Sequence, residues 1–149
     1  MTRTSFRQIL AEKEFWLLVF IGLLYFYKPL FLDETFFFRD LYSHFYPHKK
    51  LLIEYWNQGA LPLWDPYLQG GTPFLGNINN NVLYPSNILY LFLPTVTAFN
   101  LDLIIHVIFS TLATYAFSRI IGFSKPASLL AGVIYGYCGY ALSHINLFI

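Results

Sequence analysis

Charged residues are scarce in this sequence, and their scarcity disfavours a soluble protein. Only 11% of the residues are Asp, Glu, Lys or Arg, whereas 56% are hydrophobic; about a quarter of the residues in a typical soluble domain are charged. Because so few charges cannot cover a surface that faces water, the composition indicates that lipid replaces water around much of the chain.

Basic clusters and cysteine pairs are also missing. The net charge is only +1, and without a concentrated excess of Lys and Arg we expect no nucleic-acid partner. The single cysteine, Cys138, excludes an intramolecular disulfide. Since it lies within an apolar run, we expect it to be a small buried hydrophobic residue.

Three apolar segments approach or exceed the roughly 20 residues that a membrane-crossing helix needs: residues 15–32, 98–121 and 127–149. A signal peptide is the alternative for the first, but no small-residue cleavage site follows it. Gly132 and Gly136 in the third have the spacing that permits close helix contact. The fold class predicted is all-α membrane, a polytopic bundle of about three transmembrane helices. Because the chain stops within the third segment, we expect the N-terminal part of a larger protein.

The positive charges predict an orientation in the plasma membrane. Arg3, Arg7 and Lys13 precede the first segment, and Arg119 and Lys125 lie between the second and third. Short flanking segments that are rich in Lys and Arg stay in the cytoplasm. We therefore expect a multi-pass protein with a cytoplasmic N-terminus and an extracytoplasmic first loop at residues 33–97.

This loop is rich in aromatic residues and is expected to be ordered. Pro47 and Gly59 bracket a predicted helix over 47–58. Its apolar residues share one side and leave the other side to charge, the pattern of a helix in the membrane interface; the apolar set is Leu51, Leu52, Tyr55 and Trp56, and the charged set is Lys49, Lys50 and Glu54. Residues 61–74 predict turns without regular structure. Residues 82–93 are too short for a span and favour an interfacial or re-entrant helix.

Acidic and histidine side chains at the start of the loop could carry chemistry. Asp40 could act as a base or ligate a divalent cation, or it could cap a helix or pair with Arg39. Asp33 and Glu34 form an acidic pair that is either solvated flanking charge or part of a metal or leaving-group site. His44 and His48 are four residues apart, which suggests a metal site on an unbroken helix, but the intervening Pro47 argues against one.

Polar residues also lie near the predicted outer ends of the later spans. Asp102 and His106 share a helix face, and ionisable residues within a membrane are candidates for function. His144 and Asn146 either face the same extracytoplasmic cleft or mark the end of their span.

Several loop motifs resemble the YfhO-like bacterial membrane proteins, which are grouped with the GT-C glycosyltransferases. The residues that carry the resemblance are Asp40-Leu41-Tyr42 with Tyr46-Pro47, Gly59-Ala60-Leu61-Pro62-Leu63-Trp64-Asp65-Pro66-Tyr67, Gly70-Gly71-Thr72-Pro73-Phe74 and Tyr84-Pro85-Ser86-Asn87. A looser match continues through His144-Ile145-Asn146.

The resemblance implies a partial GT-C-like fold and a glycosyltransferase that uses a polyprenyl-phosphate-linked sugar at the extracytoplasmic face. The acceptor would be a cell-envelope glycan or polymer, and membrane lipid surrounds the protein. Asp40 would be the catalytic residue. Substrate would be bound by Arg39, Tyr42, His44, Tyr46, Trp64, Asp65 and His144. A divalent cation, Mg or Mn, is a possible cofactor, with Asp40 as its ligand and Asp33 and His44 as weaker candidates.

Two other functions fit the same sequence. A transporter or flippase of a lipid-linked or amphiphilic solute would use the loop as a gate, with Asp102 and His106 lining the path. A non-catalytic cell-envelope protein would contribute packing alone and would tolerate substitution at Asp33, Asp40 and His44.

Overall fold

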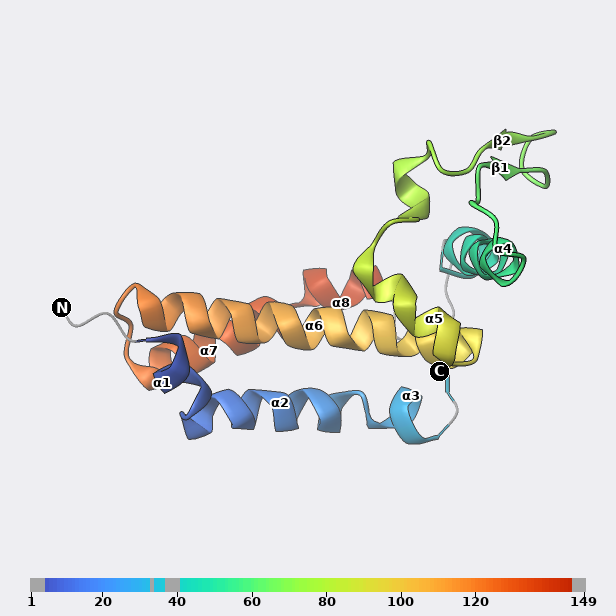
Figure 1. Cartoon of the computed structure of the whole chain (residues 1–149). Coiled ribbons are helices and arrows are strands. Elements are labelled where there is room, and N and C mark those ends of the chain that lie inside the picture. The colour runs from blue at the N-terminus through green and yellow to red at the C-terminus, as the bar shows by residue number, and fades with distance from the viewer. Residues whose placement is uncertain (1–4, 33, 37–40, 146–149) are drawn as a thin grey trace. The chain divides into compact units, whose positions relative to one another are not determined.

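The computed structural model describes residues 5–32, 34–36 and 41–145, apart from the side chains of Tyr42, His144 and Ile145, and most of these residues are helical (Figure 1). The chain divides into two compact units, which we describe separately. The helical unit contains the described residues up to Phe36 and from Leu103 onward, and the loop unit runs from Leu41 to Asp102.

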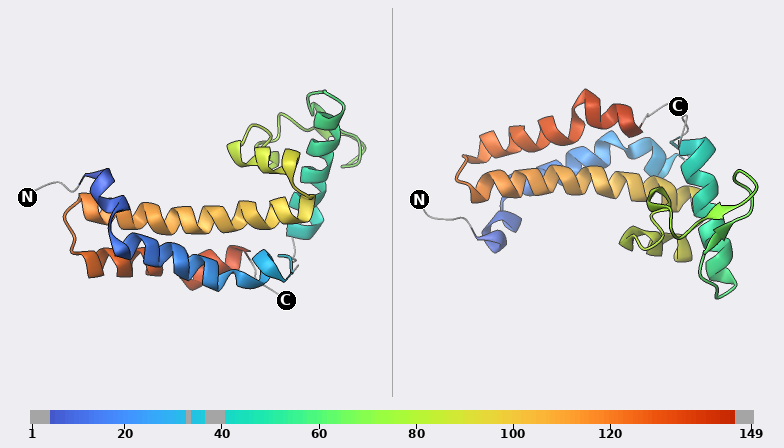
Figure 2. Two further views of the ribbon diagram at one scale, coloured as in Figure 1. Left: turned by 60° about the horizontal axis from the view of Figure 1, so that its bottom comes forward. Right: turned by 90° about the horizontal axis from the view of Figure 1, so that it is seen from above.

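The helical unit is built from helices that lie side by side, some parallel and some antiparallel to one another (Figure 2). Its elements are α1 (Phe6–Leu10), α2 (Lys13–Tyr25), α3 (Tyr27–Phe31), most of α6 (Thr95–Ile120), α7 (Lys125–Tyr137) and α8 (Gly139–Ile145). The start of α2, the end of α6 and the start of α7 meet at one end of this unit. The two segments predicted to be cytoplasmic therefore lie at the same end.

Among the described residues, α6 is the one helix long and apolar enough to cross a membrane. Its 26 residues extend about 39 Å at 1.5 Å per residue, which exceeds the hydrocarbon thickness of about 30 Å. The helix predicted within residues 98–121 is confirmed and begins slightly earlier.

The other two apolar segments each contain a break. α2 ends at Tyr25 and α3 begins at Tyr27, because Pro29 lacks the N–H that would bond to the Tyr25 carbonyl and its ring crowds that carbonyl. Cys138 has an extended backbone (φ −65°, ψ 153°) between α7 and α8. Its Sγ lies 3.4 Å from the Ala141 amide at the start of α8. Cys138 is half-buried and caps a helix, so the expected buried hydrophobic role is wrong.

The core of the helical unit lies where α1, α2, α6 and α7 meet. Ile9, Leu18, Tyr115 and Ala116 are buried there and pack against Phe15, Leu112, Leu129 and Val133. The small residues Ser128, Gly132 and Gly136 recur at every fourth position of α7 and are all buried, which confirms the close helix contact predicted from the glycine spacing.

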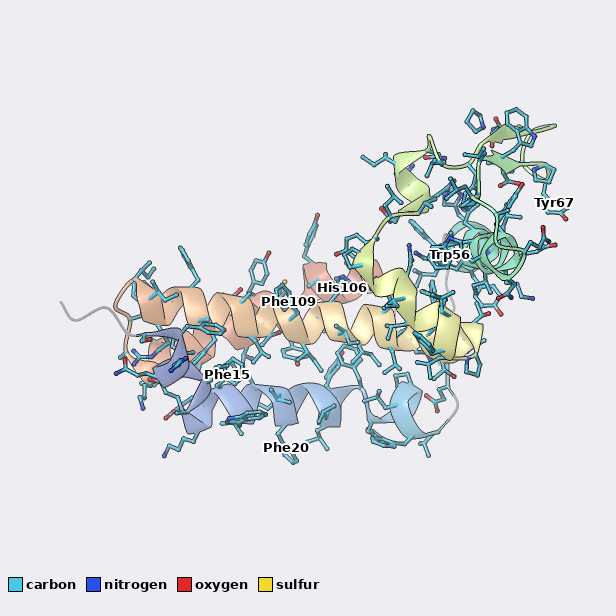
Figure 3. The ribbon with its side chains drawn as sticks, in the orientation of Figure 1. Phe15, Phe20, Trp56, Tyr67, His106 and Phe109 are labelled. Atoms are coloured by element: carbon cyan, nitrogen blue, oxygen red, sulfur yellow. The ribbon has the colours of Figure 1, made fainter. Side chains whose placement is uncertain are left out.

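The outer surface of the helical unit is apolar. Phe15 points from α2 into the core, whereas Phe20 points away from it (Figure 3). Phe20, Phe109 and Phe117 are each more than 60% exposed. Such a surface is unusual on a soluble monomer and is what a helix bundle presents to lipid.

The loop unit begins with a helix and continues through turns. One π-helical turn at Leu41–Phe45 (η1) leads directly into α4 (Tyr46–Asn57). The short strands β1 (Trp64–Asp65) and β2 (Thr72–Pro73) pair antiparallel, with Trp64 opposite Pro73. Two 3₁₀ turns, η2 (Ile78–Asn80) and η3 (Pro85–Ile88), precede α5 (Leu89–Phe92) and the first residues of α6.

The helix predicted over 47–58 is confirmed, and Gly59 ends it with a φ of +68°. The sides of the helix differ from the prediction in one respect, because Lys49 is buried while Lys50 and Glu54 are exposed. Leu51 and Leu52 pack on Phe74 and Val82 of the same unit, so the loop itself covers the apolar side of α4. The β1–β2 pair corrects the expectation of no regular structure over 61–74, and residues 82–93 form only the short helices η3 and α5.

Candidate functional site

The buried pair of His48 and Asp65 joins α4 to β1. Asp65 Oδ2 lies 3.4 Å from His48 Nε2, and the two side chains are only 6% and 9% exposed. The other carboxylate oxygen, Oδ1, accepts a hydrogen bond of 2.9 Å from the Tyr67 amide. The Asp65-Pro66 turn thus fixes the carboxylate, and the carboxylate in turn orients the imidazole.

His44 extends this pair toward the start of the loop. Its ring centroid is 4.1 Å from that of His48, at an angle of 83°. We expected Pro47 to argue against an unbroken helix through both histidines. The backbone stays helical, but the helix type changes just before Pro47, so His44 lies in the π-helical turn η1 and His48 lies in α4. Pro47 occupies the first turn of α4, where its missing N–H is tolerated. The preceding π-helical turn is rare in proteins and is often found at functional sites.

The environment of His48 favours a neutral imidazole. Burial lowers its pKa from the ordinary value of 6.5, His44 lowers it further, and Asp65 opposes both effects. Because an ionised carboxylate can only accept a hydrogen bond, the position of Asp65 beside Nε2 favours the tautomer that carries its hydrogen on Nε2. The buried Nδ1 has no hydrogen-bond partner within the described part of the chain. His48 therefore presents a lone pair that can accept a proton.

Trp64 and Tyr46 are held by separate contacts. The Tyr55 hydroxyl donates a hydrogen bond of 2.8 Å to the Trp64 carbonyl. The Trp64 indole covers Gly71 so closely that a Cβ there would lie 2.6 Å from the ring. Trp64 remains 48% exposed next to buried Asp65. Tyr46 packs edge-on against Phe99 at 6.2 Å, with Lys50 above its ring.

A second polar cluster surrounds Lys49 and was not predicted. The Lys49 Nζ donates a hydrogen bond to Asn87 Oδ1 and lies 5.3 Å from the centre of the Tyr90 ring. The Tyr90 hydroxyl donates to Asp102 Oδ2 at 3.4 Å, and the negative charge of Asp102 raises the pKa of Lys49 against the larger lowering effect of burial. Asp102 is thus part of this polar cluster, and the path that the sequence suggested for Asp102 and His106 stays a prediction.

The remaining predicted residues have no described side-chain geometry. Asp33, Arg39 and Asp40 lie outside the described residues, as do the side chains of Tyr42 and His144. Within the described ranges, no group of three His, Cys, Asp or Glu side chains is placed to hold a metal ion. The structure therefore brings together His44, His48 and Asp65, and a divalent cation stays a prediction.

No known family model, curated protein or solved structure matches this chain.

Proposed function

We propose that this chain is part of a multi-span membrane glycosyltransferase, of the YfhO-like type that its loop motifs resemble. It would take the sugar from a polyprenyl-phosphate-linked donor at the extracytoplasmic face and transfer it to a cell-envelope glycan or polymer. The same proposal includes two further membrane spans in addition to α6. It also places the N-terminus in the cytoplasm. The apolar exterior of the helical unit and the shared end of its basic segments support them.

The observation that carries the proposal is the arrangement of His44 beside the buried pair of His48 and Asp65. A carboxylate that orients a neutral imidazole is a common arrangement for moving a proton, and glycosyl transfer requires a proton to leave the acceptor hydroxyl. His44 is at the end of this arrangement that lies away from Asp65, and it follows Asp40 by four residues in the sequence.

The proposed roles follow from this arrangement. Asp40 takes the proton from the acceptor hydroxyl as the acceptor oxygen bonds to the anomeric carbon of the sugar. The bond from that carbon to the phosphate oxygen breaks, and the polyprenyl phosphate leaves as its anion. His44 or His48 then accepts that one proton from Asp40, with Asp65 as the positioning residue for His48. Trp64, half-exposed beside Asp65, offers an aromatic face on which a sugar ring can pack.

The test is transfer by the protein reconstituted in lipid vesicles with a radiolabelled polyprenyl-phosphate sugar. Asp40→Asn should reduce transfer about 10²-fold or more, the usual contribution of a general base, while leaving donor binding intact. Asp65→Asn should reduce transfer less and should change its dependence on pH. Glu54→Gln is the matched control, since Glu54 is an exposed carboxylate on α4.

Two results would overturn the proposal. If Asp40→Asn transfers sugar at the original rate, Asp40 is not the base. If the labelled lipid crosses the vesicle membrane without any covalent change, the protein is a transporter or flippase.

A further inference from the structure

The second half of the loop unit carries no charge before its last residue, Asp102. From Pro66 to Leu101 the sequence contains no Asp, Glu, Lys, Arg or His. An ordered loop that faces water normally carries such residues. Their absence over 36 residues indicates that much of this segment does not face bulk water.

Three backbone carbonyls of this segment are satisfied internally by asparagine side chains, whereas the buried Asn80 Oδ1 and Ser86 Oγ have no hydrogen-bond partner in the described part of the chain. The Asn80 side chain donates a hydrogen bond of 2.9 Å to the Phe74 carbonyl. The Asn87 side chain donates to the carbonyls of Val82, at 3.0 Å, and Asn81. Asn80 and Asn87 are buried. Irregular backbone can lie near hydrocarbon only if its polar groups are paired within the protein, and these asparagines provide such pairing.

The apolar side chains of the same segment point outward. Ile78 and Leu83 are 86% and 84% exposed, and together with Leu75 and Tyr84 they line a hollow of about 270 Å³. Ile88, Leu91 and Phe92 follow at helical spacing and are also exposed, Phe92 by 79%. We call Leu75, Ile78, Leu83, Ile88, Leu91 and Phe92 the apolar loop surface.

This surface includes residues from 82–93, which the sequence favoured as an interfacial or re-entrant helix, but it is different from the apolar side of α4. The amphipathic pattern of α4 predicted that its apolar side lies on the membrane. That side is instead covered by Phe74 and Val82, whereas the apolar loop surface has no cover among the described residues of its unit.

We propose that the apolar loop surface docks into the headgroup region of the lipid bilayer. The covalent connection to α6 selects lipid as the occupant. Phe92 precedes Thr95, the first residue of α6, by three residues, a distance of at most about 10 Å along the chain. If α6 crosses the membrane, its outer end keeps the Phe92 end of this surface beside the bilayer. The inference therefore rests on the membrane insertion of α6, which is part of the proposed function.

Nitroxide labelling of the protein in phosphatidylcholine vesicles tests the proposal. Ile78→Cys, Leu83→Cys and Phe92→Cys are each made together with Cys138→Ser and labelled. Because these positions are exposed, the labels displace no core side chain. Collision with oxygen, which concentrates in lipid, should be several-fold higher relative to collision with a water-soluble nickel complex than at a label on Glu54→Cys of α4.

A label on Phe109→Cys, an exposed position of α6, separates the possible outcomes. If the Phe109 label reports lipid and the three loop labels report water, the docking proposal is overturned while the insertion of α6 stands. If the loop labels are shielded from both reagents, another protein segment covers the surface, and the proposal is again overturned. If the Phe109 label reports water, both the insertion of α6 and the docking fail.

Discussion

Thr111 of α6 lies so close to Gly136 of α7 that a Cβ built on Gly136 would be 1.8 Å from Thr111 Oγ1. The Thr111 hydroxyl donates a hydrogen bond of 2.9 Å to the Val107 carbonyl, so it cannot turn away without losing that bond. Gly132, one turn earlier, is also tight, since its Cβ would be 3.0 Å from the Thr111 carbonyl oxygen. The α6–α7 contact thus depends on glycine, which has no Cβ, at positions 132 and 136 of α7.

Gly136→Ala should destabilise the helical unit. Alanine improves helix propensity by about 1 kcal/mol, but overpacking a tight contact typically costs about 1–3 kcal/mol, and here the clash involves a fixed side chain. We expect a lower Tm for thermal unfolding in detergent micelles. Gly139→Ala is the control, since nothing lies within 4 Å of a Cβ there. Thr111→Ala should partly rescue the variant, and equal Tm values for the two alanine variants would contradict the packing.

The carboxylate of Glu12 should make the helical unit sensitive to acid. It lies 2.8 Å from Arg119 Nη2 and 3.5 Å from Lys125 Nζ, and it accepts a hydrogen bond from the Tyr115 hydroxyl. The hydrogen bond from Arg119 is the main cause that lowers the pKa of Glu12 to about 2. Because the folded pKa is below the ordinary 4.5, this stabilisation is present above pH 4.5 and is lost as the pH falls toward 2.

The size of the effect can be measured by unfolding between pH 7 and pH 2. Its upper limit is about 3 kcal/mol. Glu12→Gln should lower the free energy of unfolding at pH 7 and remove the contribution of this group to acid sensitivity. Glu54→Gln, at an exposed carboxylate, should preserve that sensitivity. The assignment is wrong if both variants keep the same acid dependence.

Local sequence signals predicted part of this structure. Pro47 and Gly59 correctly bracketed α4, and the glycine spacing predicted the α6–α7 contact, because helix ends and close contacts depend on residues that are few and specific. Hydropathy averaged across Pro29 concealed the break between α2 and α3. The extended backbone at Cys138 has no signal in the sequence that we can identify.

The pairings within the loop unit could not be predicted. Asp65 and His44 were candidates for substrate binding, but only the turns after Gly59 bring Asp65 to His48. Lys49 seemed to belong to the polar side of α4 by helical spacing alone. Its partner Asn87 is 38 residues away, and a contact at that separation depends on the path of the intervening chain rather than on any local pattern.

The titration of His48 should shift in opposite directions when its two neighbours are changed. His44 lowers the pKa of His48, whereas Asp65 raises it. We therefore expect His44→Gln to raise this pKa and Asp65→Asn to lower it, measured by NMR of protein with isotope-labelled histidine. Lys50→Gln, on the exposed side of α4, should leave it unchanged. Shifts in the same direction for both variants would show that His48 does not lie between these groups.

Two adjacent lysines of α4 should respond differently to alkaline pH. Burial lowers the pKa of Lys49 below the ordinary 10.5, so the unfolded chain holds this proton at a pH where the folded protein has released it. The free energy of unfolding therefore gains a contribution from Lys49 that grows as the pH rises from the folded pKa toward 10.5.

The difference in stability between the original protein and Lys49→Met should increase over this range, and the same difference for Lys50→Met, at an exposed position, should stay constant. The titration of tyrosines other than Tyr90, which lies beside Lys49, and Tyr46, which lies beside Lys50, is common to all three proteins and cancels in these differences. Parallel behaviour of the two variants in chemical unfolding would mean that Lys49 is as solvated as Lys50.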